Sequence, residues 1–130
     1  MKTIIAGPRN FNDYNKLLKV FLLYPDLEKN ITEIVSGKAK GVDTLGERWA
    51  RENKIPIKSF PADWNKYGNS AGPIRNLQMA NYADALIALW DDISKGTGDM
   101  IEKAKNKGLK ILIYYFNDDT FETFNFLKFN

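Results

Sequence analysis

Short apolar runs alternate with helix-like stretches along the chain, and this alternation limits the available folds more than any other feature. The runs have the length of buried strands and occupy residues 2–7, 31–37, 55–60, 84–90 and 109–116. Apolar side chains recur at helical spacing in residues 13–24, 42–53, 74–82 and 97–107. Parallel neighbours need crossover connections, which these helices supply. The sequence therefore predicts an α/β fold, with one five-stranded parallel sheet and helices on both faces in a single Rossmann-like domain.

The chain is expected to fold as one unit. Its 130 residues, 44% of them apolar, match the size of one domain with a substantial core. We expect the Rossmann-like domain to span residues 1–116. Residues 117–130 form an aromatic tail that we expect to pack on the domain or on a dimer partner; its phenylalanines are Phe121, Phe124, Phe126 and Phe129.

The sequence contains no cysteine and no histidine, and this shortens the list of chemistries open to it. Disulfides, thiolate nucleophiles, Ser-His-Asp triads and zinc sites built from Cys or His are excluded. Acid or base chemistry would fall to Asp, Glu, Tyr or a perturbed Lys. No apolar run approaches the ~20 residues that span a bilayer, and the amino terminus lacks the features of a secretory signal. We therefore expect a cytoplasmic protein without a membrane partner.

The net charge of +3 argues against nucleic acid as the main partner. Proteins held to nucleic acid by counterion release display clustered basic faces, and an excess this small is typical of an ordinary solvated surface. The small positive excess could still slightly favour the binding of anionic small molecules.

Most glycines and unusual polar residues gather in the segments that follow the predicted strands. These segments read GPRNFND, SGKAKGVD, PADWNKYGNSAG and DDISKGTGD, whereas the segments after the helices are short and plain. In open parallel sheets ligands bind outside the carboxyl ends of the strands. The segments after the strands therefore predict one shared site.

Two of these segments have the features of phosphate-binding turns. Gly37 and Gly41 bracket a strand-to-helix turn, where they permit close approach of the backbone to an anion at the helix amino terminus. Gly96 and Gly98 do the same in a later turn, where Thr97 can cap the helix or donate to a phosphate oxygen. Glycines at such turns are also often purely structural. The candidate ligand-binding residues are Gly7, Arg9, Ser36, Gly37, Lys38, Gly41, Asp43, Asp63, Trp64, Arg75, Gly96, Thr97 and Gly98.

The charged and aromatic candidates each have a second interpretation. Arg75 could bind a phosphate or carboxylate through a bidentate pair of hydrogen bonds, or form a helix-end salt bridge. Asp43 and Asp63 could accept ribose hydroxyls or act as an acid or base, and could equally cap helices. Trp64 could stack on a base or pack on the rim. Rim carboxylates could also hold Mg²⁺ through water alongside a nucleotide, although no spacing requires a cofactor.

The successive strings GPRNFND, VSGKAKGVDTLGERWA and FPADWNKYGNSAGPIRNLQMANYADALIALWDDISKGTGDMIEKA resemble the motifs of the SLOG superfamily. The resemblance is to its YspA/cpYpsA-related branch of small proteins, common in bacteria and phages, and it covers about residues 3–113. It implies a Rossmann-like sheet that binds nucleotides or nucleotide-derived ligands. Relatives include the LOG phosphoribohydrolases, which split a nucleoside monophosphate into base and ribose 5-phosphate, and domains that sense nucleotide-derived signals in bacterial defence.

The LOG motifs match this chain only in part. The Arg-x-x-x-Met motif matches Arg75 and Met79, while the Pro-Gly-Gly-x-Gly-Thr-x-x-Glu motif is matched only by Gly96 and Thr97. Met100 occupies the glutamate position, and the nearest carboxylate is one residue away, which on a helix is a turn of about 100 degrees. The resemblance therefore implies phosphate binding more than catalysis, with Arg75 and Asp99 as the catalytic candidates.

Three functions remain open at this point. The first is binding of a nucleotide or nucleotide-derived ligand. The second is N-glycosidic hydrolysis of a nucleoside monophosphate, in which a rim carboxylate stabilises positive charge on the sugar. The third is a nucleic-acid or protein interaction module. A symmetric homodimer, as in LOG-like proteins, is expected to bury apolar surface, and a monomer is equally compatible with the sequence.

Overall fold

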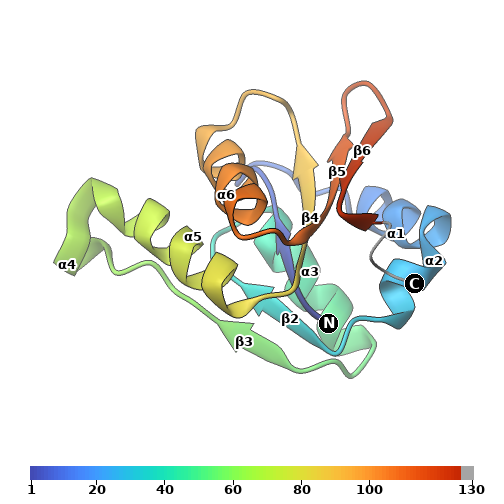
Figure 1. The fold of residues 1–130 in the computed structure, drawn as a ribbon, viewed down its shortest axis with the longest axis horizontal. Coiled ribbons are helices and arrows are strands. Elements are labelled where there is room, and N and C mark those ends of the chain that lie inside the picture. Colours follow the sequence, from blue (N-terminus) through green and yellow to red (C-terminus); the bar gives the residue numbers. More distant parts are fainter. Residues whose placement is uncertain (127–130) are drawn as a thin grey trace.

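The computed structural model describes residues 1–126, in which one six-stranded sheet lies between two layers of helices (Figure 1). The strand order is β3-β2-β1-β4-β5-β6, and β1 to β5 are mutually parallel. All five predicted strands are confirmed, to within two residues at each end. The strands are β1 (Lys2–Ala6), β2 (Glu33–Ser36), β3 (Ile57–Ser59), β4 (Ala85–Trp90), β5 (Lys110–Tyr115) and β6 (Thr120–Phe124).

The prediction of a five-stranded, wholly parallel sheet is wrong at one edge. Residues 120–124, expected to be tail, form β6, which pairs with β5 in antiparallel register with Tyr114 opposite Phe121. Only a tight turn joins the two strands, and a connection that short can join only antiparallel neighbours. The Phe121 ring stacks on Tyr114 with centroids 4.5 Å apart. Phe124 and Phe126 also pack against the core, and Phe129 lies outside the described residues.

The four predicted helices are present, together with two short ones. The helices are α1 (Tyr14–Leu23), α2 (Pro25–Lys29), α3 (Val42–Glu52), α4 (Trp64–Tyr67), the 3-10 turn η1 (Gly68–Ser70), α5 (Ala71–Tyr82) and α6 (Lys95–Asn106). Helix α5 begins three residues before the predicted start, because Pro73 fits the first turn, where its missing N–H costs no hydrogen bond. Within residues 1–126 no helix is long and apolar enough to cross a membrane.

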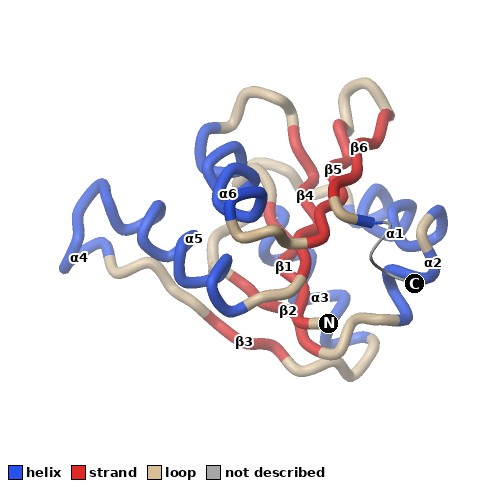
Figure 2. The backbone as a smooth tube through the Cα atoms, viewed as in Figure 1, coloured by secondary structure: helices blue, strands red, loops and turns tan. Residues whose placement is uncertain are grey.

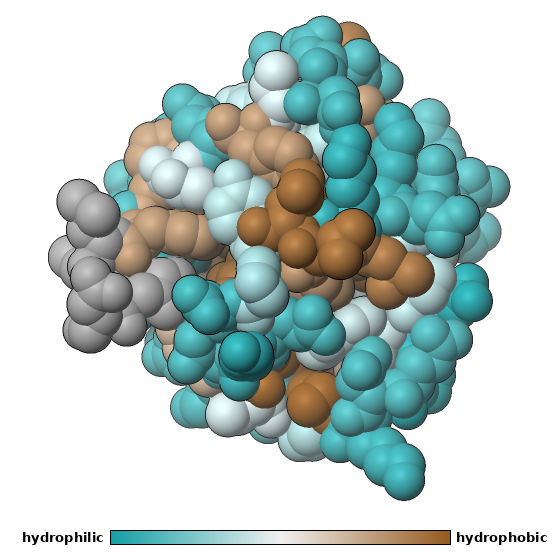
Figure 3. Space-filling model, turned by 90° about the vertical axis from the view of Figure 1, so that its right-hand side faces the viewer, coloured by the Kyte–Doolittle hydropathy of each residue, from teal (hydrophilic) through white to brown (hydrophobic). Residues whose placement is uncertain are grey.

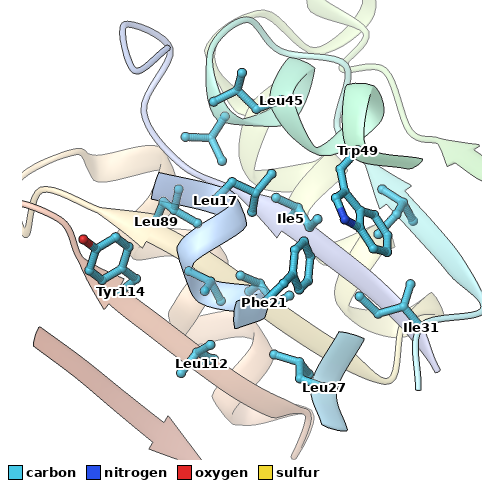
Figure 4. Close-up of a cluster of buried hydrophobic side chains, with 14 of the residues drawn as sticks. Ile5, Leu17, Phe21, Leu27, Ile31, Leu45, Trp49, Leu89, Leu112 and Tyr114 are labelled. Carbon is cyan, nitrogen blue, oxygen red and sulfur yellow. The ribbon is translucent and has the colours of Figure 1, made fainter. Parts of the chain in front are cut away.

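The core consists of two apolar layers, one on each face of the sheet. Successive strand residues point to opposite faces. Thus Ile5 and Ile87 join the layer under α1 and α3, which Figure 4 shows, while Ile4 and Leu86 join the layer under α5 and α6. Both faces are covered by helices, as predicted for a parallel sheet.

Helix α1 leaves three leucines on the surface. Leu18, Leu22 and Leu23 are 39%, 80% and 52% exposed. Figure 3 faces the side of the molecule that bears α1 and α2 and shows apolar side chains gathered in its centre. Such a face is compatible with the expected homodimer, which stays a prediction.

Candidate functional site

A cavity of about 660 Å³ opens at the carboxyl end of the sheet, and we name it the rim cavity. Its walls are the segment after β1, the amino-terminal turns of α5 and α6, and parts of α3 and α4. Strand β1 lies between β2 and β4, so the direction of strand addition reverses between β1 and β4. Ligands bind at such switch points in open α/β sheets. Helices α4 and α5 extend away from the sheet beside this edge (Figure 2).

The structure brings eight of the candidate residues to the rim cavity and leaves six outside its wall. Those on the wall are Gly7, Arg9, Asp43, Trp64, Arg75, Gly96, Thr97 and Asp99. Those outside it are Ser36, Gly37, Lys38, Gly41, Asp63 and Gly98. Residues on the wall that were not singled out from the sequence include Asn10, Ala39, Asn76, Ser94 and Lys95.

The amino terminus of α6 forms one wall of the rim cavity, and its first backbone N–H groups donate no hydrogen bond within residues 1–126. The first intrahelical hydrogen bond runs from the Gly98 N–H to the Ser94 carbonyl, so the N–H groups of Lys95, Gly96 and Thr97 precede it. The Ser94 hydroxyl, which would ordinarily cap the helix, donates instead to Asp91 Oδ2 at 2.7 Å. The helix dipole and these N–H groups together favour an anion at this wall.

Arg75 is held in place by a network between α5 and α6. Its Nη1 donates to the Gly37 carbonyl and its Nε to Asn76 Oδ1 at 3.0 Å. The Asn76 amide then donates to the Gly96 carbonyl at 3.2 Å and to Asp99 Oδ2 at 2.9 Å. Arg75 Nη2 donates no hydrogen bond to residues 1–126 and is free to contact a ligand. Burial lowers the pKa of the Arg75 guanidinium, and the nearby Asp43 and Asp99 offset this.

Asp99 is already engaged within the protein. Its Oδ2 accepts from Asn76, and its Oδ1 accepts from Lys103 one helical turn later. A carboxylate with both oxygens bonded is poorly placed to act as a nucleophile or base. Its place in the network instead helps to orient Asn76 and, through it, Arg75.

Asn76 is a buried organiser of the site that sequence reasoning missed. It is 6% exposed and contacts Arg75, Gly96 and Asp99. A buried amide must satisfy its donors and its acceptor, and this one does so by joining two helices. In the sequence it is a polar residue beside Arg75, with no motif to mark it.

Asp43 lies in the first turn of α3 with one oxygen open to the rim cavity. The residue is only 6% exposed, and its Oδ2 accepts from the Ala39 N–H at 3.2 Å. Its Oδ1 has no hydrogen-bond partner in residues 1–126. Every side-chain N or O atom of these residues that is shielded from solvent has a hydrogen-bond partner. Because Oδ1 has no partner, it must be accessible to solvent. Burial raises the pKa of Asp43 to about 6, although the Ala39 N–H and the charge of Arg75 act in the opposite direction.

Replacing Asp43 by asparagine is expected to stabilise the fold at neutral pH. The folded-state pKa of about 6 lies above the ordinary 3.8, so the folded protein binds this proton more tightly than the unfolded chain does. The stability that the protonated group contributes is fully present below pH 4 and is lost as the pH rises through 6. At pH 7.5 this loss of stability is about 3 kcal/mol. Asparagine does not ionise, so the variant avoids the loss.

Urea unfolding of both proteins at two pH values checks this expectation. The variant should be more stable by up to about 3 kcal/mol at pH 7.5 and nearly equal to the wild type at pH 4. The same difference in unfolding free energy at both pH values would contradict a raised pKa.

Ser36 and Lys38 contact a buried glutamate instead of the rim cavity. The Ser36 hydroxyl donates to Glu47 Oε2 at 2.6 Å, and Lys38 Nζ lies 2.9 Å from Glu47 Oε1. Burial would raise the pKa of Glu47, but the hydrogen bonds from Ser36 and Lys38 outweigh it and lower this pKa. These two predicted ligand contacts are therefore engaged in stabilising the turn between β2 and α3.

Gly37 and Gly41 are required by close packing. A Cβ on Gly37 would lie 2.6 Å from Arg75 Nη1 and 3.0 Å from Asp43 Oδ2, so glycine lets Arg75 reach its place. Gly41 has φ +77°, and a Cβ there would lie 2.2 Å from the Pro8 carbonyl oxygen. That carbonyl also accepts from the Val42 N–H at 3.3 Å. The start of α3 is therefore occupied by protein backbone and not by a ligand.

The remaining candidates divide between the cavity wall and the local structure. Trp64 is 48% exposed on the wall, with the Arg9 guanidinium 5.6 Å from its ring centroid. Asp63 caps α4 by accepting from the Lys66 N–H at 3.1 Å, which is the capping role left open for it. Gly98 lies against the ring of Trp90, and a Cβ there would be 3.2 Å from that ring.

Comparison with known proteins places the chain in a family. A family model described as the YspA, cpYpsA-related SLOG family matches residues 1–67. The gene 61 protein of Mycobacterium phage D29 is 31% identical over 85 residues, which are 61% of this chain and 68% of the phage protein.

A solved structure confirms the type of fold. The crystal structure of DNA processing protein A (DprA) from Streptococcus pneumoniae aligns with 86% of this chain at a TM-score of 0.65 and 19% identity. This chain spans about half of that protein, 49% of its length. At this identity the likeness shows the Rossmann-like fold and nothing about partners. With the family match over half of its length, the chain belongs to the YspA, cpYpsA-related SLOG family.

Proposed function

We propose that this protein binds a nucleotide or nucleotide-derived ligand in the rim cavity, with a phosphate group at the amino terminus of α6. The observation behind this proposal is that the uncapped start of α6 and the guanidinium of Arg75 lie on the wall of the same cavity. Backbone N–H groups at a helix amino terminus and the free Nη2 group of Arg75 are both suited to phosphate oxygens. Lys95 adds a further positive charge to this wall.

The rest of the cavity suits the sugar and base of such a ligand. Its volume of about 660 Å³ lies within the range of about 300–1,000 Å³ typical of small-molecule sites. Trp64 offers an exposed indole on the wall of the same cavity, and aromatic faces stack on nucleobases. The rim cavity therefore offers partners for the phosphate and the base of a nucleotide, and room for its sugar.

Hydrolysis of the N-glycosidic bond has less support than binding. Asp99, the carboxylate nearest to the LOG glutamate position, has both oxygens bonded to protein groups. In this proposal Mg²⁺ would bind together with the phosphates of the nucleotide, since at such sites the ion keeps several waters and needs only one or two protein carboxylates.

Ligand-observed proton NMR on a panel of nucleotides tests the proposal and separates binding from hydrolysis. The panel contains nucleoside mono- and diphosphates, NAD and ADP-ribose, each with and without Mg²⁺, and the anomeric sugar protons are followed over hours. Broadened but intact signals from at least one nucleotide are the expected result. Loss of the anomeric signal with release of free base would establish a hydrolase, and sharp signals throughout would refute nucleotide binding.

Oligonucleotide binding is the competing function, because the similar solved structure is that of a DNA-processing protein. DprA is a DNA processing protein by name, although its likeness here concerns the fold alone. Titration of single-stranded DNA at low and high salt distinguishes the two, because phosphate-backbone binding weakens steeply with salt. We expect nucleotide binding to exceed oligonucleotide binding at physiological salt.

Replacing Trp64 by alanine is expected to weaken nucleotide affinity by about tenfold, because stacking on an aromatic ring contributes about 1–3 kcal/mol per base. Tyr67→Ala is the matched control, since Tyr67 is an exposed aromatic of the same helix and lies off the cavity wall. Calorimetric titration of both variants measures the difference. Equal losses in the two variants would argue against stacking on Trp64.

A further inference from the structure

Asp43 offers the rim cavity an acceptor that the protein itself does not use. Its Oδ2 is bonded to the Ala39 N–H, while Oδ1 is open to the cavity and unpartnered in residues 1–126. The side chain is more than nine-tenths buried, on a helix that is fixed in the core by Val42 and Leu45. Solvent reaches this oxygen in the free protein, so a ligand that covers it must supply a donor in place of water or leave a buried carboxylate oxygen unsatisfied.

The position of this oxygen indicates which part of a ligand would reach it. Arg75 Nη1 and Asp43 Oδ2 both lie within 3.0 Å of the position that a Cβ on Gly37 would take, so the carboxylate adjoins the group proposed to clamp the phosphate. In a nucleotide the sugar is joined directly to the phosphate, and the base lies farther away. A carboxylate beside a phosphate clamp therefore meets sugar hydroxyls, which are donors, and would repel the phosphate itself.

We propose that Asp43 makes the rim cavity selective for ribonucleotides, by accepting a hydrogen bond from a ribose hydroxyl on its Oδ1. This inference rests on the proposed nucleotide-binding function and adds the class of sugar to it. A deoxy sugar that lacks the bonded hydroxyl leaves Oδ1 buried beneath the ligand without a donor. Sites built around a hydrogen bond to a hydroxyl reject analogues that lack it much more strongly than apolar pockets reject extra groups.

Matched sugar pairs test the proposal. Calorimetric titration compares AMP, GMP, CMP and UMP with their 2′-deoxy and 3′-deoxy counterparts at pH 7.5, where Asp43 is ionised. For any base that binds, we expect one of the two deoxy forms to bind about 10- to 100-fold more weakly than the ribonucleotide. Which of the two loses affinity identifies the hydroxyl that is bonded.

Variants assign the selectivity to Asp43. In Asp43→Ala the ratio of ribonucleotide to deoxynucleotide affinity should fall close to one, whereas Asp43→Asn, whose amide can still bond a hydroxyl, should keep part of the selectivity. Asp63→Asn is the matched control, because Asp63 is an exposed helix cap off the cavity wall and asparagine caps helices equally well; its ratio should equal that of the wild type. Circular dichroism shows that each variant is folded.

The possible outcomes separate this inference from the function on which it rests. Equal affinity for ribo- and deoxynucleotides in the wild type overturns the role of Asp43 while nucleotide binding stands. Selectivity that persists in Asp43→Ala overturns the assignment to this residue. Absence of binding by every nucleotide overturns the proposed function and the inference together.

Discussion

Replacing Arg75 by alanine is expected to weaken nucleotide affinity by about 100-fold, because charge-assisted hydrogen bonds contribute about 1.5–3 kcal/mol each and tenfold in affinity is about 1.4 kcal/mol. Arg75→Lys should recover only part of this loss. Lysine keeps the positive charge, but its single ammonium group cannot bond Gly37 and Asn76 as the guanidinium does and also present a fixed N–H to the phosphate. Calorimetric titration with the best nucleotide of the NMR panel measures both variants.

Arg51→Ala is the control for the change in net charge. Arg51 lies near the end of α3, off the cavity wall, with its side chain 62% exposed. It should leave affinity within about twofold of the wild type, since an exposed charge outside the site contributes little. If Arg75→Ala bound nucleotide as tightly as Arg51→Ala while remaining folded, Arg75 would not be the clamp.

Replacing Gly41 by alanine is expected to destabilise the fold by about 3 kcal/mol or more, since it combines a left-handed backbone with a steric clash. Gly41 has φ +77°, and a Cβ there would lie 2.2 Å from the Pro8 carbonyl oxygen and 2.6 Å from the Arg9 carbonyl oxygen. Both contacts are to backbone, so the segment after β1 would have to move. Thermal and urea unfolding measure the loss.

Gly108→Ala separates the clash from the backbone strain. Gly108 also has a positive φ, of +71°, but a Cβ there would meet no atom within 4 Å. It should cost about 1 kcal/mol, the usual penalty for a left-handed residue with a side chain. Equal destabilisation by the two substitutions would show that the contact between Gly41 and the segment after β1 does not matter.

The fold was largely predictable because the core strands of a parallel sheet appear in the sequence as short, regular apolar runs. Helices on both faces require each strand to be apolar on both sides, and β4 (Ala85–Trp90) shows this as a continuous run. Strand β6 (Thr120–Phe124) was missed because it lies at an edge and its five residues are all exposed or half-buried. Its aromatic residues resembled a packing tail as much as a strand.

The location of the rim cavity was predictable, but the partner of each polar side chain was not. Loop composition placed Arg75 and Thr97 at the carboxyl edge, where the structure has them on one wall. The sequence predicts Ser36 and Lys38 as ligand contacts, yet both hydrogen-bond Glu47, eleven and nine residues farther along the chain. Sequence spacing does not show which donor a buried carboxylate will take, because that depends on how α3 packs on β2. Asn76 was missed for the same reason.

A nucleotide phosphate bound at the start of α6 would change the surroundings of the first backbone amides of this helix, and amide NMR observes each of them separately. A ¹⁵N-labelled protein is titrated with the best-bound nucleotide and, separately, with the corresponding nucleoside, which lacks phosphate. We expect the backbone amides of Lys95, Gly96 and Thr97 to shift with the nucleotide and to shift much less with the nucleoside. Nucleotide binding that leaves these three amides unmoved would contradict phosphate binding at the start of α6.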